Sequence, residues 1–281
     1  MKIAILSGKG GTGKTLLSVN LAAAAKKAVY LDCDVEEPNG HLFLKPVDNK
    51  MKDINVLMPV VDNDLCDGCK KCVDFCAFNA LAYAGGELMI FEKICHSCGG
   101  CKLVCPQGAI SEKERSIGTV EKGVSDDIVI YTGMLDPGEA SGTMIIESLL
   151  EEVKDDKGLV FIDAPPGSAC VVMESIKDAD YCVLVAEPSI FGAHNLEMVH
   201  ELVELFKKPF GVVLNKCTEK ENPSEKYCKE NGIKILGKIP FSYELGGLTS
   251  AGKIAANENE EFGELFLALL KEVQSEATSH S

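Results

Sequence analysis

A glycine-rich segment near the N-terminus carries the residue types that can hold a chain of phosphates. This glycine loop reads Gly8-Lys9-Gly10-Gly11-Thr12-Gly13-Lys14-Thr15, the pattern G-x-x-x-x-G-K-T. Glycines let backbone N–H groups approach phosphate oxygens without Cβ clashes, and the N-terminus of a following helix adds a positive dipole. We expect Lys14 to reach the β- and γ-phosphates, and the Thr15 hydroxyl to hold Mg2+.

Carboxylates follow two apolar runs of strand length farther along the chain. Asp32 ends the first run and is followed by Asp34, and Asp163 ends the second, one residue before a Pro-Pro-Gly turn. Ligands of α/β sheets bind at the carboxyl ends of strands, so these side chains should lie beside the phosphates. We expect Asp163 to hold Mg2+ through its water shell, and Gly167 to respond to the γ-phosphate. The simpler alternative is that these carboxylates only cap loops.

Two copies of one cysteine spacing lie between positions 66 and 105, and together they contain eight of the thirteen cysteines. Each copy reads C-x2-C-x2-C-x3-C, and the second follows the first at an offset of 29 positions. The ligand candidates are Cys66, Cys69, Cys72 and Cys76 in the first copy, and Cys95, Cys98, Cys101 and Cys105 in the second. Thiolates at this spacing bind iron–sulfur clusters, and zinc is the competing metal. We expect two 4Fe–4S clusters.

An α/β framework is needed to bring the loop and the carboxylates together. Apolar runs predict strands at 3–6, 28–32, 159–163, 181–186, 210–214 and 235–240, and short strands at 117–124 and 127–131. Helical patterns cover 15–27, 143–153, 193–206 and 260–273. Strands that alternate with helices predict a doubly wound, mostly parallel sheet. The cysteine segment is then inserted into the connection that follows the second strand.

The second lysine of the glycine loop, in K-G-G-T-G-K-T, makes it similar to the deviant Walker A loop of the MinD/ParA and nitrogenase-iron-protein family. The segment D-x-D-x-x-x-P-N from Asp32 resembles switch I of that family. The resemblance implies that ATP closes a homodimer in which Lys9 contacts nucleotide held by the partner, and that Asp34 activates the attacking water. It implies that Asp32 supports the loop and the water shell of Mg2+, and that Asn215 and Pro240 contact adenine. A solvated loop lysine is the alternative for Lys9.

The duplicated cysteine segment resembles a bacterial-type two-cluster ferredoxin of α+β fold. The whole chain is similar to MinD-superfamily ATPases that carry such an insert, and is related to Mrp/Nbp-type ATPases. In these ferredoxins the fourth cysteine of each copy ligates the other cluster. The resemblance assigns Cys66, Cys69, Cys72 and Cys105 to the first cluster, and Cys95, Cys98, Cys101 and Cys76 to the second. The expected domains are a P-loop ATPase domain, 1–58 with 114–281, and a ferredoxin domain, 59–113.

Composition narrows the class of partner. A formal net charge of −15 over 281 residues argues against non-specific binding to nucleic acid. No apolar run is long enough to span a membrane, and the acidic helix expected at 260–273, with a frayed end at 275–281, would be repelled by anionic lipid. The chain begins directly with a strand and is rich in cysteine, so we expect a reducing cytoplasm and no stable membrane anchoring.

The sequence therefore predicts a slow, partner-stimulated ATPase that is coupled to two clusters. In one hypothesis, it passes electrons to a partner metalloprotein. In another, it is an assembly or positioning factor whose ferredoxin module senses redox state or docks a client. A third is an electron carrier whose loop only binds nucleotide. Outside the insert there is no C-x2-C, and Cys170 stands alone after the Pro-Pro-Gly turn, so we expect it to be a buried or interface thiol.

Overall fold

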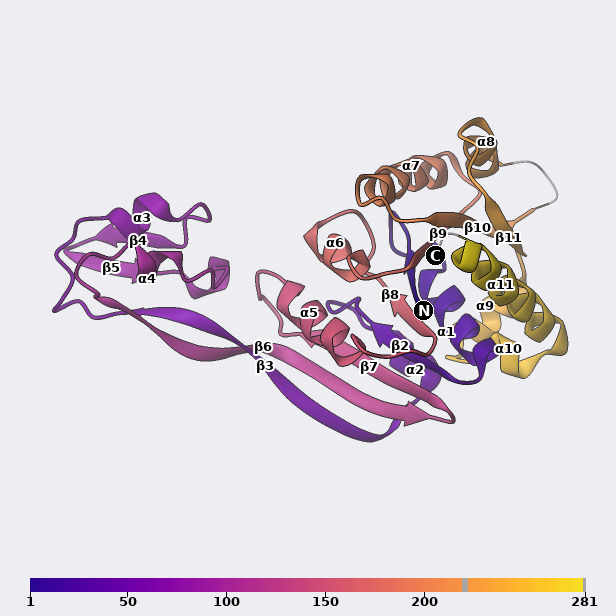
Figure 1. Ribbon diagram of the computed structural model, residues 1–281, viewed down its shortest axis with the longest axis horizontal. Coiled ribbons are helices and arrows are strands. Elements are labelled where there is room, and N and C mark those ends of the chain that lie inside the picture. Colours follow the sequence, from indigo (N-terminus) through magenta and orange to yellow (C-terminus); the bar gives the residue numbers. More distant parts are fainter. Residues whose placement is uncertain (219–221, 280–281) are drawn as a thin grey trace.

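The computed structural model describes residues 1–218 and 222–279. Figure 1 shows a body, a long two-stranded arm, and a small head at the far tip of the arm. The arm consists of β3 (Val47–Val61) and β6 (Ile110–Ser125), and the head is the segment 62–109 between them. The body is made of the described residues among 1–46 and 126–279.

One large sheet extends through the body and into the arm. Within the described residues it has nine strands in the order β11-β10-β9-β1-β8-β2-β7-β6-β3. Neighbours from β11 to β7 are parallel, whereas β6 runs antiparallel to both β7 and β3. The parallel strands are β1 (Lys2–Leu6), β2 (Ala28–Asp32), β7 (Ile128–Leu135), β8 (Val160–Asp163), β9 (Tyr181–Ala186), β10 (Phe210–Cys217) and β11 (Ile235–Pro240). The predicted α/β class with a mostly parallel sheet is confirmed.

Helices cover both faces of this sheet, because alternate strand residues point to opposite sides. Ile3 and Ile5 enter one core, and Ala4 and Leu6 enter the other. The first core lies under α1 (Lys14–Ala25), α2 (Gly40–Leu44), α9 (Tyr243–Ser250), α10 (Ala255–Glu258) and α11 (Glu260–Ser279). The second core lies under α5 (Thr143–Glu152), α6 (Cys170–Ile176), α7 (Ile190–Leu205) and α8 (Pro223–Glu230). The sheet is therefore wound on both faces.

The arm is the largest departure from the sequence prediction. No strand was expected before the insert, and only short strands after it, whereas β3 and β6 pair from Val47 opposite Val124 to Val61 opposite Ile110. The first seven residues of β3 are all exposed, so their side chains carry no alternating apolar signal. As an edge strand, β3 also tolerates a proline in its ladder. The predicted domain boundaries, after 58 and 113, fall inside these two continuous strands.

The head combines short helices with a small sheet. Its elements are α3 (Lys71–Phe75), β4 (Leu81–Ala84), β5 (Glu87–Ile90), the 3-10 helix η1 (Glu92–Ile94) and α4 (Gly100–Leu103). The small core between them contains Leu81, Leu88 and Ile110, together with Cys72 and Cys101. Cysteine sulfur therefore makes up part of the interior of the head.

The last helix is longer than predicted. Val273 and Ala277 extend the buried stripe of α11, so the helix continues to Ser279. The expected frayed end is therefore wrong for 275–279, and its last two residues lie outside the described residues. Among the described helices, none combines the length and the apolar character that a membrane span requires.

Candidate functional site

The glycine loop connects β1 to α1 at the carboxyl edge of the sheet. Gly13 has φ 98°, and a Cβ on it would lie 2.0 Å from Asn215 Nδ2, so no other residue fits there. Strand β10 braces the loop from the outside. Asn215 Nδ2 donates to the Thr12 carbonyl at 2.7 Å, and Lys216 Nζ donates to the Gly11 carbonyl at 2.8 Å. The loop is thus held in shape by the protein itself.

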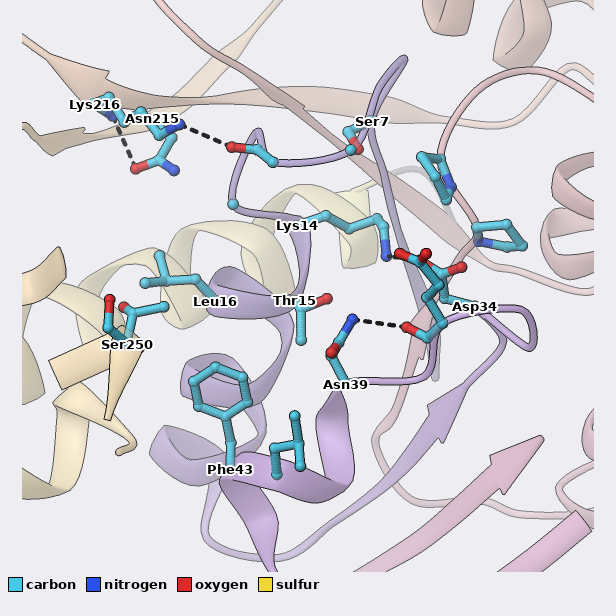
Figure 2. Close-up of a pocket in the computed structure, with 18 of the residues that line it drawn as sticks. Ser7, Lys14, Thr15, Leu16, Asp34, Asn39, Phe43, Asn215, Lys216 and Ser250 are labelled. Atoms are coloured by element: carbon cyan, nitrogen blue, oxygen red, sulfur yellow. Dashed lines mark hydrogen bonds and ion pairs between the residues drawn. The ribbon is translucent and has the colours of Figure 1, made fainter. Parts of the chain in front are cut away.

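A cavity of about 850 Å3 opens beside the loop. Figure 2 shows its polar end, where Lys14 and Asp34 point toward each other, with Thr15 next to them. Leu16 and Phe43 line the other end, which is largely apolar. A small-molecule site of this kind, polar at one end and apolar at the other, suits a phosphate chain with an aromatic base.

Lys14 meets two carboxylates at the polar end. Its Nζ lies 2.7 Å from Asp163 Oδ1 and 3.7 Å from Asp34 Oδ2, and only 6% of its side chain is exposed. Strand β8 lies between β1 and β2, so the sheet order brings these groups to one edge. Asp163 is fully buried and accepts a second hydrogen bond from the Tyr30 hydroxyl at 2.8 Å. Lys14 can therefore bind phosphate only by giving up contacts with these carboxylates.

Three carboxylates, Asp32, Asp34 and Asp163, lie around the single ammonium group of Lys14 at the polar end. Burial and this imbalance of charge both shift the pKa values of these groups. Burial raises the pKa of Asp34 to about 6, although Lys14 opposes the rise. Burial likewise raises the pKa of Asp32, and the neighbouring Asp163 adds to the effect. For Lys14, burial lowers the pKa, but its hydrogen bond and attraction to Asp163, together with the charges of Asp34 and Asp32, outweigh burial and the net shift is upward. An added cation would relieve this excess of negative charge.

Asp32 is directed at the backbone. Its Oδ2 accepts the Gly40 N–H at 2.8 Å and its Oδ1 accepts the Asp34 N–H at 3.3 Å, so it shapes the loop that presents Asp34.

Among the described residues, no three His, Cys, Asp or Glu side chains are placed to hold a metal ion by themselves. Mg2+ in nucleotide sites usually takes one or two protein ligands and completes its shell with phosphates and water. Thr15 and Asp163 fit that limited role.

The Lys9 side chain is held by a carboxylate of its own chain. It forms an ion pair with Glu187, which follows β9, and Lys216 Nζ lies 3.5 Å from the other oxygen of the same carboxylate. Burial raises the pKa of Glu187, but the two lysines outweigh burial and the net shift is downward. Lys9 is 38% exposed and must leave Glu187 before it can contact a partner subunit.

Asn215 and Pro240 are the two residues expected to contact adenine. Pro240 and Asn215 both line the cavity. However, the Asn215 amide already donates to the Thr12 carbonyl and accepts the Lys216 N–H at 2.8 Å. Its established contacts brace the glycine loop, and its contact with a base stays a prediction.

The eight cysteines of the insert all lie in the head, and the structure brings the first expected set of four together. The first cysteine group, Cys66, Cys69, Cys72 and Cys105, lines one small cavity. Gly68, inside the first loop, has φ 71°, and a Cβ there would lie 2.6 Å from the Tyr83 hydroxyl. The loop therefore needs glycine to curl around its cysteines. Three cysteines of one copy and the last of the other thus meet at one place.

The second cysteine group, Cys95, Cys98, Cys101 and Cys76, is joined less directly. Burial raises the pKa of Cys101, and the nearby Cys95 and Cys98 add to the rise. The loop after Cys76 contacts the loop of the second copy, because the ring of Phe78 stacks on His96 with centroids 3.8 Å apart, and the place of Cys76 as fourth ligand stays a prediction. All thirteen cysteines are free thiols, but no three of them are placed to hold a metal ion among the described residues, so cluster binding stays a prediction.

Comparison with known proteins decides the family. The model of the CobQ/CobB/MinD/ParA nucleotide binding domain matches residues 3–253. The chain belongs to this family. The match spans the arm, the head and the body as far as residue 253, and the glycine loop lies near its start. Nucleotide binding follows from membership of the family.

Relatives of this nucleotide-binding family cover nearly the full chain. An uncharacterized protein of Methanocaldococcus jannaschii is 32% identical over 278 residues, which is 98% of this chain and 96% of its own. A protein of the same organism named iron-sulfur cluster carrier protein is 25% identical, over 97% of this chain and 85% of its own. The solved structure of the septum site-determining protein MinD with Mg-ADP, from Pyrococcus horikoshii, has a TM-score of 0.61 at 20% identity. It covers 100% of this chain and 98% of its own, and shares the fold.

Some residues of the site escaped the sequence reasoning. Glu187 was visible only as a carboxylate after a strand, and nothing in the sequence links it to Lys9. Tyr30 lies inside an apolar run, which hides its hydrogen bond to Asp163. Cys170 is exposed at the start of α6, so the buried alternative is wrong for the single chain, and the interface alternative stays a prediction.

Proposed function

We propose that this nucleotide-binding protein binds Mg-ATP, hydrolyses it slowly, and uses ATP-dependent dimerisation to control electron transfer toward a partner metalloprotein. Two 4Fe–4S clusters in the head would carry the electrons. The observation that supports the ATP part most strongly is the meeting of Lys14, Asp163 and Asp34 at the polar end of the cavity. Three groups from three strand ends converge there, beside a loop held in shape for phosphates.

Each residue of the polar end has one task in this proposal. Lys14 leaves its carboxylate partners for the β- and γ-phosphates, which releases Asp163 to support Mg2+ together with the Thr15 hydroxyl. Asp34 orients the attacking water and, with a pKa of about 6, is ionised at neutral pH. Lys9 exchanges Glu187 for nucleotide held by a second copy of the chain, where its charge stabilises the transition state.

The head would be the electron-transfer part. The first cysteine group supports a cluster bound by three cysteines of one copy and the fourth of the other, because these four line one cavity. The second group would hold the other cluster, with Cys76 as its fourth ligand. A 4Fe–4S cluster supplies reversible one-electron transfer when bound. In this proposal the inserted domain is the head with the outer part of the arm.

A second candidate function is the assembly or positioning of a metal cofactor. It is favoured by the relatives named iron-sulfur cluster carrier protein, which align over nearly the whole chain. In that role ATP would drive the loading or recruitment of a client, and the head would sense redox state or dock. The lone Cys170, with no second cysteine at a C-x2-C spacing in the body, gives this function less support.

Anaerobic redox titration followed by EPR, with and without Mg-ATP, tests the proposal. We expect about eight irons per chain and a fall in midpoint potential of about 60 mV with Mg-ATP, roughly 1.4 kcal/mol for one electron. Turnover should be lost in Lys14→Ala with the iron content intact. Full cluster loading with bound ATP but no shift in potential would favour the assembly function instead. Turnover that persists in Lys14→Ala would exclude the glycine loop as the catalytic site.

A further inference from the structure

A tyrosine hydroxyl lies behind the carboxylate that Lys14 contacts. Tyr30 is on β2 and its register partner on β8 is Phe161, so Asp163 lies two residues farther along β8 on the same face of the sheet. A diagonal neighbour at this spacing is within reach of a long aromatic side chain. The Tyr30 hydroxyl donates to Asp163 Oδ2 at 2.8 Å, and Tyr30 is fully buried. A strand that otherwise supplies the core therefore brings a hydrogen-bond donor to a carboxylate of the polar end.

The surroundings of this hydroxyl fix its position. Gly40, at the start of α2, leaves room for the ring, because a Cβ there would lie 2.4 Å from Tyr30 Cε1 and 2.6 Å from the hydroxyl oxygen. Ser18 Oγ on α1 is 3.4 Å from the same oxygen and donates to the Thr15 carbonyl at 3.0 Å. Both hydroxyl hydrogens are thus used elsewhere, and the contact between the two oxygens is weak. The direction of the Tyr30 hydroxyl is set by Asp163.

The carboxylate of Asp163 has one donor on each oxygen. Lys14 Nζ is 2.7 Å from Oδ1, and the Tyr30 hydroxyl is 2.8 Å from Oδ2. Asp163 is fully buried, and the charges of Asp32 and Asp34 lie close to it. A buried carboxylate that loses a donor is destabilised unless another donor takes its place.

The two donors of this carboxylate differ in what nucleotide does to them. Lys14 lines the cavity and leaves the carboxylate when it binds phosphate. Tyr30 is not among the residues that line the cavity, so phosphate does not compete for its hydroxyl. Its hydrogen bond to Asp163 can therefore persist while the ammonium group moves.

We propose that Tyr30 is a positioning residue that holds Asp163 while Lys14 moves from this carboxylate to phosphate. The inference rests on the proposed binding of Mg-ATP. The hydroxyl keeps Oδ2 paired, so that only Oδ1 needs a new donor after Lys14 has left. Mg2+, when bound, supplies water molecules that can donate to Oδ1. Tyr30 thus lowers the cost of phosphate binding, and this contribution is greatest when no metal is present.

The experiment measures ADP binding to the anaerobically purified full chain by calorimetry, once in EDTA and once in Mg2+. Tyr30→Phe removes only the hydroxyl, and in EDTA it should weaken ADP binding by about tenfold, because Asp163 then loses both donors. In Mg2+ the loss should shrink to about twofold or less, since metal-bound water replaces a donor. Tyr131→Phe, on the neighbouring strand β7, is the matched control. Its buried side chain packs in the core on the other face, so ADP affinity should stay at the wild-type value in both conditions.

The dependence on metal separates positioning from a merely structural bond between β2 and β8. Such a bond would lower the melting temperature of Tyr30→Phe and leave ADP affinity unchanged, and that result would overturn the proposal. An equal loss of affinity in EDTA and in Mg2+ would also overturn it, because it would indicate a distorted cavity. So would a wild type that binds ADP only with Mg2+, since Tyr30 would then not suffice to let Lys14 leave.

Two further results keep this inference apart from the proposed function. A wild type that binds ADP in neither condition would overturn the proposed function, whereas wild-type affinity in Tyr30→Phe would refute only the role of Tyr30. If Tyr30→Phe fails to fold, Gly40→Ala takes its place, because its Cβ displaces the hydroxyl. Gly40→Ala should weaken ADP binding more in EDTA than in Mg2+, and a loss that does not depend on the metal would refute the proposal.

Discussion

Asp34→Asn should make the nucleotide-free protein more stable while it abolishes hydrolysis. The Asp34 carboxyl has a pKa of about 6 in the folded chain against an ordinary 3.8, and burial is the main cause. A raised carboxyl pKa means that the ionised group opposes folding. This cost is complete above the folded pKa, declines as the pH falls toward 3.8, and is absent below it.

The size of the effect follows from the two pKa values. A difference of about two units corresponds to about 3 kcal/mol at pH 7.5 and to about half of that at pH 5. The Asp34 side chain is 18% exposed, so water reduces the cost, and we expect a gain of about 1–2 kcal/mol at pH 7.5. The amide of asparagine keeps the size of the side chain, so packing should not change.

Urea denaturation under anaerobic conditions at pH 7.5 and pH 5 measures this gain. Glu36→Gln is the matched control, because it removes a negative charge from the same loop at an exposed position and should change stability by less than about 0.5 kcal/mol. A less stable Asp34→Asn variant at pH 7.5, or a gain that is equally large at pH 5, would refute the reasoning. Nucleotide binding by calorimetry should persist while turnover is lost.

Three other changes test separate parts of the site. Lys14→Met leaves the buried Asp163 without its cation and should lower the free energy of unfolding by about 3–5 kcal/mol, whereas Lys27→Met at an exposed position should not. Glu187→Gln frees Lys9, so ATP-dependent dimers should form at a lower nucleotide concentration, as measured by sedimentation velocity. Glu197→Gln, at an exposed position, is the control. Unchanged dimerisation in Glu187→Gln would contradict a restraining role for Glu187. Cys69→Ser should remove about four irons per chain, whereas Cys170→Ser should leave the iron content unchanged, and loss of iron in Cys170→Ser would point to a bridging cluster.

The part of the fold that the sequence predicts best is the part with buried strands. Strands 28–32 and 181–186 are continuous apolar runs that end in polar or turn residues, and the structure has them at these bounds. The sequence also predicts that Lys14, Asp34 and Asp163 meet, because each follows a strand of a parallel sheet. These signals are local, since burial on both faces requires apolar residues at every position.

The features that could not be predicted depend on contacts between distant segments. Strand β3 is held by pairing with β6, and the exposed side chains of its first half leave no pattern to read. The pairing of Lys9 with Glu187, and of Arg115 with Glu139, joins residues whose types are common on any protein surface. Such pairs become visible only when the topology places their strands side by side.

The pairing of β3 with β6 in the arm also affects how the chain folds. Strands β2 and β7 are neighbours in the sheet, but the whole arm and head lie between them in the sequence. A long flexible loop would make their pairing costly in chain entropy and slow. Because β3 and β6 pair along their full length, a head that has already folded brings β2 and β7 close together. In the proposed cluster-binding function, early metal loading of the head would then speed completion of the sheet, and a chain without metal should complete it more slowly.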